Sequence, residues 1–278
     1  MGQCLRKYNK LINFIDFTTI TILAHFIARG EITIFPQTHI FFAETVLRRR
    51  SDAITLGSLF PDMVISARVS HAMAHSLGAE LLYVVKENHA LADFARGIIT
   101  HGISPHGLDY FGDEKYPGCE RGYCFEKGRP LVKHTIEACN IPPEMGWWKA
   151  HNIVEMGIEL RISNRGAYGH LIHQAFNNQE LIDQITSLLG ELTGYREQGL
   201  KKRIAGFPGY IEIYKATAQS LADKYQVQMF ARHGININTV KVARLIEIAA
   251  EQVEDDLDDF FRYTYDIVLR ELDKIERY

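Results

Sequence analysis

The chain has 278 residues, of which 46% are hydrophobic and 23% are charged, and its formal net charge is −3. These values are typical of a globular protein that is long enough to bury a sizeable core. They exclude a strongly basic protein, and because no basic stripe is interleaved with aromatic residues, we expect no stable complex with nucleic acid.

Residues 1–35 are predicted to be a poorly defined extension outside the main domain. Lys7 and Lys10 precede an apolar run, as in a signal peptide, but the run contains Asp16 and His25 and no small-residue cleavage site follows it. A transmembrane helix needs about 20 consecutive apolar residues, so we expect no transmembrane segment. The default location is therefore cytoplasmic, and secretion stays open.

The four cysteines are scattered, and no C-x-x-C pair occurs. This argues against a zinc ribbon or a thioredoxin-like centre. Cys119 and Cys124 are close enough in sequence to form a disulfide in an oxidising compartment, but two free thiols are the preferred interpretation.

Helical periodicity dominates the chain from residue 36 onwards. Apolar residues recur at helical spacing over 37–50, and the glycine and proline at 57–62 predict a break. Further helices are predicted over 66–85 and 91–101. Sustained alternation typical of strands is absent, so the sequence predicts an all-α fold.

The stretch 102–130 differs because it contains nine glycine and proline residues. It is predicted to be a long irregular loop, and long loops inside compact domains are often functional. Helices are predicted again over 131–139 and, opened by Pro142 and Pro143, onwards to residue 160.

The remaining residues, 179–278, are also helical by pattern and end in one long acidic helix over 240–277. We therefore predict a single all-helical domain over 36–278. Its metal-binding half would cover 36–165, and its C-terminal helical half would cover 166–278.

The sharpest chemical signal is the pair His151 and Glu155. Positions i and i+4 of a helix share one face, so an imidazole and a carboxylate can reach the same ion. Zinc binds nitrogen and oxygen ligands at about 2.0–2.2 Å. A surface His–Glu pair is the alternative, because a motif this short is weak alone.

His71 and His75 form a second pair at the same spacing, with small residues between them. A polar face of a buried helix is the alternative interpretation. His101 closes a predicted helix and precedes a glycine-rich loop with an acidic residue, Asp109. Ligands at such a place can leave an open coordination position, although a histidine also suits the negative end of a helix dipole.

Two further residues stand at defined turns. Asp62 follows a proline, which would fix the direction of its carboxylate, and alone it would be interpreted as a helix cap. His39 starts a predicted helix and carries no meaning by itself.

Taken in order, these elements are P-x-T-H, G-S-L-x-P-D, a histidine pair, a helix that ends in T-H-G, and H-N-x-x-E. The ordered set resembles the zinc-dependent phospholipase C family, which is related to the S1/P1 nucleases. The resemblance covers roughly residues 36–160. It implies an all-helical bundle of the phospholipase C/P1 nuclease type, here with additional C-terminal helices, around one to three Zn²⁺ ions.

The resemblance also implies which side chains bind metal. The candidate ligands, by motif, are His39, Asp62, His71, His75, His101, Asp109, His151 and Glu155. Among these, Asp62 would be a ligand or the base that aligns the attacking water, and His75 is preferred over His71.

Two positions of the family pattern have no direct match. The family has an aspartate four residues after the histidine matched by His101, and Pro105 stands there. His106, Asp109 and Asp113 are the alternatives for that ligand, and Asp109 is preferred. For a further histidine ligand, His134 is the nearest candidate.

The activity implied is that of a metal-dependent phosphoric-ester hydrolase in which a metal-bound water attacks phosphorus. Its substrate would be a small phosphoester or a phospholipid headgroup.

Two alternatives stay open. One is a non-catalytic binding or structural protein that keeps the metal for stability, with acidic residues of the last helix as a partner surface. The other is an S1/P1-like nuclease, whose candidate base-stacking aromatics are Tyr110, Phe111, Trp147 and Trp148.

Overall fold

The computed structural model describes residues 35–65, 69–85, 87–193 and 195–277. All regular secondary structure in these ranges is helical, and they contain no strand, so the predicted all-α class is confirmed. The predicted N-terminal extension lies outside the described residues, apart from its last residue, Phe35.

The helices fall into two consecutive sets, on either side of the turn at residue 164. The first set is α3 Pro36–Leu47, α4 Asp52–Val64, α5 His71–Ala74, α6 Gly78–Val85, α7 His89–His101, the π-helical turn η2 Tyr110–Glu114, α8 Tyr123–Gly128, η3 Arg129–Leu131, α9 Val132–Cys139, η4 Pro143–Met145 and α10 Gly146–Ser163. The second set is α11 Tyr168–Asn177, α12 Gln179–Thr193, α13 Glu197–Gly206, η5 Phe207–Gly209, α14 Ala218–His233, α15 Thr239–Gln252 and α16 Leu257–Glu276.

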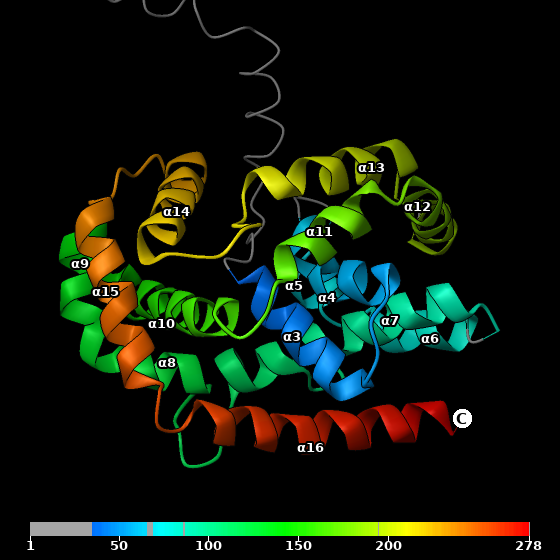
Figure 1. Ribbon diagram of the computed structural model, residues 1–278, viewed down its shortest axis with the longest axis horizontal. Helices are drawn as coiled ribbons and strands as arrows, with labels where there is room; N and C mark the ends of the chain where they lie inside the picture. The colour runs from blue at the N-terminus through cyan, green and yellow to red at the C-terminus, as the bar shows by residue number, and fades with distance from the viewer. Residues whose placement is uncertain (1–34, 66–68, 86, 194, 278) are drawn as a thin grey trace, which may run out of the picture.

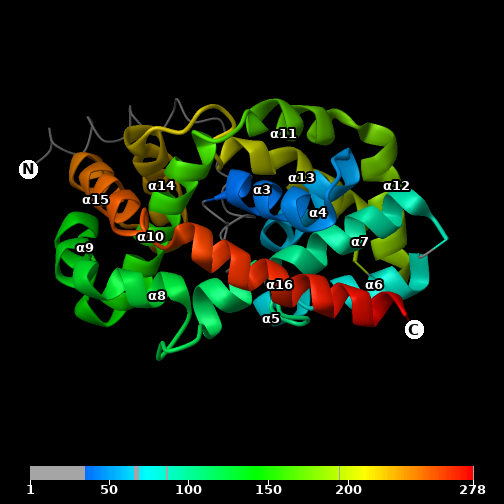
Figure 2. The same ribbon diagram turned by 60° about the horizontal axis from the view of Figure 1, so that its bottom comes forward.

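Helices α3 and α10 lie in the middle of the molecule (Figure 1). Helices α8, α9 and α15 surround one end, and α6, α7 and α12 lie at the other. Helix α16 packs against α3 and α7 and runs along one side between the two ends (Figures 1 and 2). Buried apolar side chains form one cluster that draws on both sets of helices, for example Leu59, Ile153 and Ile246. No helix in the described ranges has the length and the apolar character needed to cross a membrane.

Helices α4 and α7 pack closely against each other, and glycine makes their spacing possible. A Cβ atom added to Gly57 would lie 2.1 Å from the carbonyl oxygen of Phe94 and 3.1 Å from the Cα atom of Gly97. No larger residue fits between backbones at this distance. The pairing brings the carboxyl-terminal ends of the two helices together, and these ends carry Asp62 and His101.

The break predicted over 57–62 is wrong, because α4 continues through Pro61. Proline inside a helix removes one backbone hydrogen bond and disfavours the preceding turn. Here every residue from Ala53 to Val64 is buried, and the side chain of Ser51 caps the first turn by accepting the N–H of Ile54 at 3.1 Å. Burial and capping outweigh the local preference of proline.

The single helix predicted over 66–85 is also wrong, because the chain forms α5 and α6 with a turn between them. The side chain of Ser70 caps α5 by accepting the N–H of Met73. The carbonyl of His75 then accepts the N–H groups of Ile103 and Ser104 at 3.0 and 3.4 Å, instead of continuing a helix. This contact ties His75 to the segment that follows α7.

Two other predicted elements differ from the structure. The stretch 102–130 is not wholly irregular, since it contains η2 and α8, whose residues Tyr123, Cys124 and Phe125 are buried. The predicted last helix is two helices, α15 and α16, joined by a turn at Val253–Asp256. Asp258 and Asp259 fall in the first turn of α16, where the helix dipole favours acidic side chains.

Candidate metal centre

Side chains suited to metal binding converge between α3, α4, α5, α7, η2 and α10. Among the described residues they form three groups, and in each group the ligand atoms lie within 4.8 Å of one another. The groups are His39, Asp62 and His101; His71, His75 and Asp109; and Asp113, His151 and Glu155. The structure therefore brings together all eight residues that the sequence nominated, together with Asp113, which the sequence offered as an alternative to Asp109.

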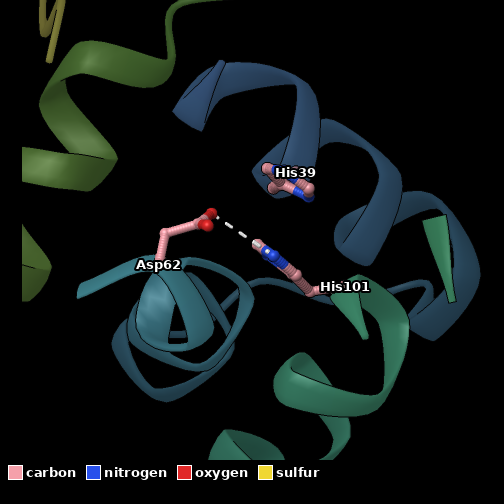
Figure 3. Close-up of side chains that lie close together, drawn as sticks. All are labelled: His39, Asp62 and His101. Atoms are coloured by element: carbon pink, nitrogen blue, oxygen red, sulfur yellow. Dashed lines mark ion pairs between the residues drawn. The ribbon is translucent and has the colours of Figure 1, made fainter. Parts of the chain in front are cut away.

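The first group joins three helices (Figure 3). His39 comes from α3, Asp62 from α4, and His101 is the last residue of α7. His101 Nε2 lies 3.3 Å from Asp62 Oδ2, and the rings of His39 and His101 stack with centroids 3.8 Å apart. Among the described residues, neither ring nitrogen of His39 has a hydrogen-bond partner, although the residue is only 1% exposed. A buried imidazole without a hydrogen bond is costly, and a metal ion would reduce that cost.

A buried carboxylate fixes the beginning of α3 and thereby the position of His39. Glu159, on α10, accepts the backbone N–H groups of Gln37 and Thr38 at 3.0 and 2.9 Å and the hydroxyl of Thr38 at 2.7 Å. The first N–H groups of a helix have no partner within the helix, and α3 has no side-chain cap of its own. Glu159 supplies that cap from a position 121 residues away from Thr38.

Backbone contacts orient two of the imidazole rings. His101 Nδ1 donates to the carbonyl of Ser58 at 2.6 Å, and His75 Nδ1 donates to the carbonyl of His71 at 2.9 Å. Each contact leaves Nε2 to face the cluster, and the two Nε2 atoms lie 3.2 Å apart. A second partner that fixes the tautomer is the usual arrangement of a metal-binding histidine.

Asp109 lies at the centre of the cluster. Its carboxylate is 3.5 Å from His39 Nε2, 3.2 Å from His75 Nε2 and 3.0 Å from His101 Nε2. The Asp109 carboxylate is therefore within reach of three of the histidines that the sequence nominated as ligands. His106, a further alternative that the sequence offered for this ligand, is exposed. Its ring stacks on that of Tyr110, with centroids 3.5 Å apart, and it does not enter the cluster.

The third group lies on α10 and η2. His151 Nε2 is 3.5 Å from Glu155 Oε2, one helical turn away, and Asn152 donates to Glu155 at 3.0 Å. Asp113 shares a hydrogen bond with Glu155. Asp109 directly precedes the π-helical turn η2, and Asp113 lies within it, four residues later. π-helical turns frequently occur at functional sites.

Helix α8 packs closely against α10 at His151. A Cβ atom on Gly128 would lie 2.9 Å from the carbonyl carbon of Ala150, so only glycine permits this approach of α8 to α10. The ring of Phe125 stacks on that of His151 with centroids 4.1 Å apart. An aromatic wall of this kind limits the rotation of the imidazole.

The pKa values show the electrostatic conflict that a divalent cation would relieve. Burial, followed by the neighbouring Asp113, raises the pKa of Glu155 well above its usual range. Burial, assisted by the charge of Lys149, lowers the pKa of His151 to about 3. Although burial alone would lower it, the charges of Asp109 and Asp62 raise the pKa of His101 to about 9. Perturbed groups of this kind cluster at functional sites.

A cavity opens directly over the second and third groups. Its walls are Phe35, Asp62, His71, Asp109, Asp113, Lys149, His151, Asn152, Glu155, Tyr225, Gln228, Met229 and Arg232. The sequence did not nominate Lys149 or the α14 residues Tyr225, Gln228 and Arg232. The three α14 residues share one helix face, at positions i, i+3 and i+7, but this spacing alone does not indicate a cavity.

Other residues singled out in the sequence lie elsewhere. His134 is exposed on α9 and belongs to none of the three groups. Tyr110, Phe111, Trp147 and Trp148 do not line the cavity over the metal centre, and Trp147 donates its indole N–H to the carbonyl of Phe125 at 2.8 Å. Cys119 and Cys124 are free thiols, as preferred from the sequence.

The acidic residues around the start of α16 contact basic residues of the same chain. Arg161 pairs with Glu254 at 2.6 Å, and Arg165 pairs with Asp258 at 2.7 Å. Lys127 contacts Asp256 at 2.6 Å. These three acids therefore have basic partners on α8, on α10 and in the turn after α10, which accounts for part of the acidic run without an external partner.

Comparison of the chain with protein-family models, with curated proteins and with solved structures finds no match. The geometry of the cluster and the chemistry of its side chains therefore carry the functional argument.

Proposed function

We propose that this protein is a metal-dependent phosphoric-ester hydrolase that resembles zinc-dependent phospholipase C. The observation that supports the proposal is the convergence of five histidines and four carboxylates, from segments far apart in the sequence, beneath one cavity. A set of this composition suits zinc, which binds imidazole nitrogen and carboxylate oxygen. A structural zinc site is usually closed by four protein ligands, whereas several of these side chains line a cavity that a substrate could enter.

The residues divide into those that would hold metal and those that position them. His75, His101 and Asp109 would share one ion with Asp62, and Asp113, His151 and Glu155 would hold another. His39 and His71 extend the set on either side. When bound, zinc would supply positive charge for the phosphate oxygens and lower the pKa of a coordinated water towards about 7.

Asp62 is the residue proposed to act on the water. Its side chain is 5% exposed, it lines the cavity, and it lies within 3.7 Å of His75 Nε2 and 3.3 Å of His101 Nε2. A carboxylate in this position can orient a water molecule and accept its proton. The hydrogen bond from His101 Nδ1 to the carbonyl of Ser58 would keep the imidazole of His101 fixed while Asp62 accepts the proton of the water.

Metal analysis combined with a turnover assay tests the proposal. We expect purified protein to contain zinc and to hydrolyse a chromogenic phosphoester, either p-nitrophenyl phosphate or bis(p-nitrophenyl) phosphate, and Asp62→Asn to lower the rate by about 10²- to 10⁴-fold. The matched control is Asp266→Asn, an exposed aspartate of α16, which should leave the rate unchanged. Protein that binds two or more zinc ions and turns over no phosphoester would instead be a metal-stabilised binding or structural protein.

A further inference from the structure

Helix α14 contributes part of the wall of the cavity that the metal-binding residues also line. Tyr225, Gln228 and Arg232 all line the cavity and are spaced at one face of α14. Lys149, which is only 2% exposed, joins them from α10. A polar face buried by a helix from the C-terminal half is unusual unless its groups have a partner.

Two atoms of this wall have no hydrogen-bond partner among the described residues. Tyr225 is 2% exposed, and its hydroxyl makes no hydrogen bond within that part of the chain. Gln228 is also 2% exposed, and while its amide nitrogen donates to the carbonyl of Tyr210 at 3.3 Å, its carbonyl oxygen accepts nothing. Leaving such groups buried without hydrogen bonds is costly, so a ligand that binds both would recover that cost.

The charges of the cavity indicate what kind of ligand this is. Its four carboxylates, on Asp62, Asp109, Asp113 and Glu155, formally balance two divalent cations. Lys149 and Arg232 add two positive charges to the same cavity, and a phosphomonoester carries close to two negative charges. A phosphodiester carries only one. The cavity, traced by the centres of water molecules, has a volume of about 40 Å³, which suits a small polar group.

We propose that Tyr225, Gln228, Arg232 and Lys149 form a subsite for a dianionic phosphate group beside the metal centre, so that the substrate is a phosphomonoester. This proposal rests on the proposed hydrolase function and names its substrate class. Arg232 and Lys149 bind the phosphate oxygens, the hydroxyl of Tyr225 donates to one of them, and the carbonyl of Gln228 accepts from a hydroxyl of the ligand. Arginine suits this task because its planar guanidinium donates two parallel hydrogen bonds.

Calorimetric binding of two small probes to the full-length, zinc-loaded protein at pH 8 tests the subsite. The probes are methyl phosphate, a dianion at this pH, and dimethyl phosphate, a monoanion. We expect Arg232→Gln to weaken methyl phosphate binding at least tenfold and dimethyl phosphate binding less than threefold. Tyr225→Phe, which removes only the hydroxyl, should weaken methyl phosphate binding about three- to tenfold. The control, Arg244→Gln on the exposed face of α15, should change neither affinity.

Zinc content and thermal unfolding are measured on every variant, so the two proposals fail in different ways. Protein that binds no zinc contradicts the hydrolase function and the subsite together. Zinc-loaded protein that binds no methyl phosphate, or whose affinities for the two probes change equally in Arg232→Gln, overturns the subsite alone. If Arg232→Gln does not fold, Tyr225→Phe decides, and an unchanged affinity for methyl phosphate in that variant overturns the proposal.

Discussion

Two clusters of carboxylates in this protein differ in what surrounds them. In the metal centre, the side chains of Asp62 and Glu155 are 5% and 7% exposed and face histidine rings. Around the start of α16, the side chains of Glu254 and Asp258 are 60% and 70% exposed and face arginines. The two clusters contain the same chemical groups, but only the first removes them from water.

The difference teaches that burial, and not the density of acidic residues, indicates a site. An exposed carboxylate is stabilised by water whether or not an arginine contacts it, so its ion pair contributes little. A buried carboxylate without a permanent cation shifts its protonation or requires an ion. Substitutions in the buried metal centre should therefore have larger effects than matched substitutions around the start of α16.

The largest difference is expected between Asp109→Asn and Asp258→Asn. Asp109 contacts three imidazoles, so the loss of its charge should weaken zinc binding by roughly a hundredfold or more, beyond the effect of changing an outer-shell residue. Asp258→Asn should leave the affinity within about twofold, since its partner Arg165 lies on the surface. Competition with a chromogenic chelator measures both. Equal affinities in the two variants would remove the distinction between the clusters.

A pH-dependent effect is expected from Glu159, which is completely buried. Burial raises its pKa from 4.5 to about 7, so the folded protein keeps a proton that the unfolded chain releases. The associated stability is fully present below pH 4.5 and is lost as the pH rises through 7. We expect the free energy of unfolding of metal-free protein to fall between pH 5 and 7 by about 2 kcal/mol more than in Glu159→Gln.

Urea unfolding at the two pH values measures this difference. Glu247→Gln, an exposed glutamate of α15, is the control and should follow the wild type. A Glu159→Gln protein with the same pH dependence as the wild type would show that this carboxylate does not titrate in the window.

Part of the site was predictable from local sequence signals. The prediction that His151 and Glu155 lie side by side requires only that both belong to one helix. The helical pattern of the sequence predicts that helix, and the structure shows it as α10. His101 ends α7, as its position before the glycine-rich stretch predicts. Such signals are short-range, so one sequence contains them completely.

Other parts depend on contacts that no local pattern encodes. Pro61 was interpreted as a break, but tertiary burial keeps it inside α4. Glu159 caps a helix that begins more than a hundred residues earlier. Tyr225 reaches the cavity only because α14 folds over α10, and its own helix shows little amphipathic pattern. In each case a long-range contact overrides or adds to the local preference.

The pH dependence of zinc binding should distinguish the buried cluster further. Asp109 and Asp62 outweigh burial and raise the pKa of His101 to about 9 in the metal-free protein, so its imidazole is protonated at pH 7. Zinc requires the neutral ring, and binding therefore releases this proton. We expect the affinity to rise about tenfold for each pH unit between 7 and 8.5. Calorimetry in buffers of different ionisation enthalpy counts the released protons, and the absence of proton release at pH 7 would contradict the raised pKa.

The smallest effect is expected at the surface cluster, for the pair Arg165 and Asp258. The two side chains are 39% and 70% exposed and 2.7 Å apart, so water and salt screen their attraction. A double-mutant cycle with Arg165→Met and Asp258→Asn should give a coupling of about 0.2–1 kcal/mol that declines as salt is added. A salt-independent coupling of about 3 kcal/mol would be that of a buried ion pair. It would mean that this cluster is held as firmly as the metal centre, and that exposure alone does not separate a solvated face from a site.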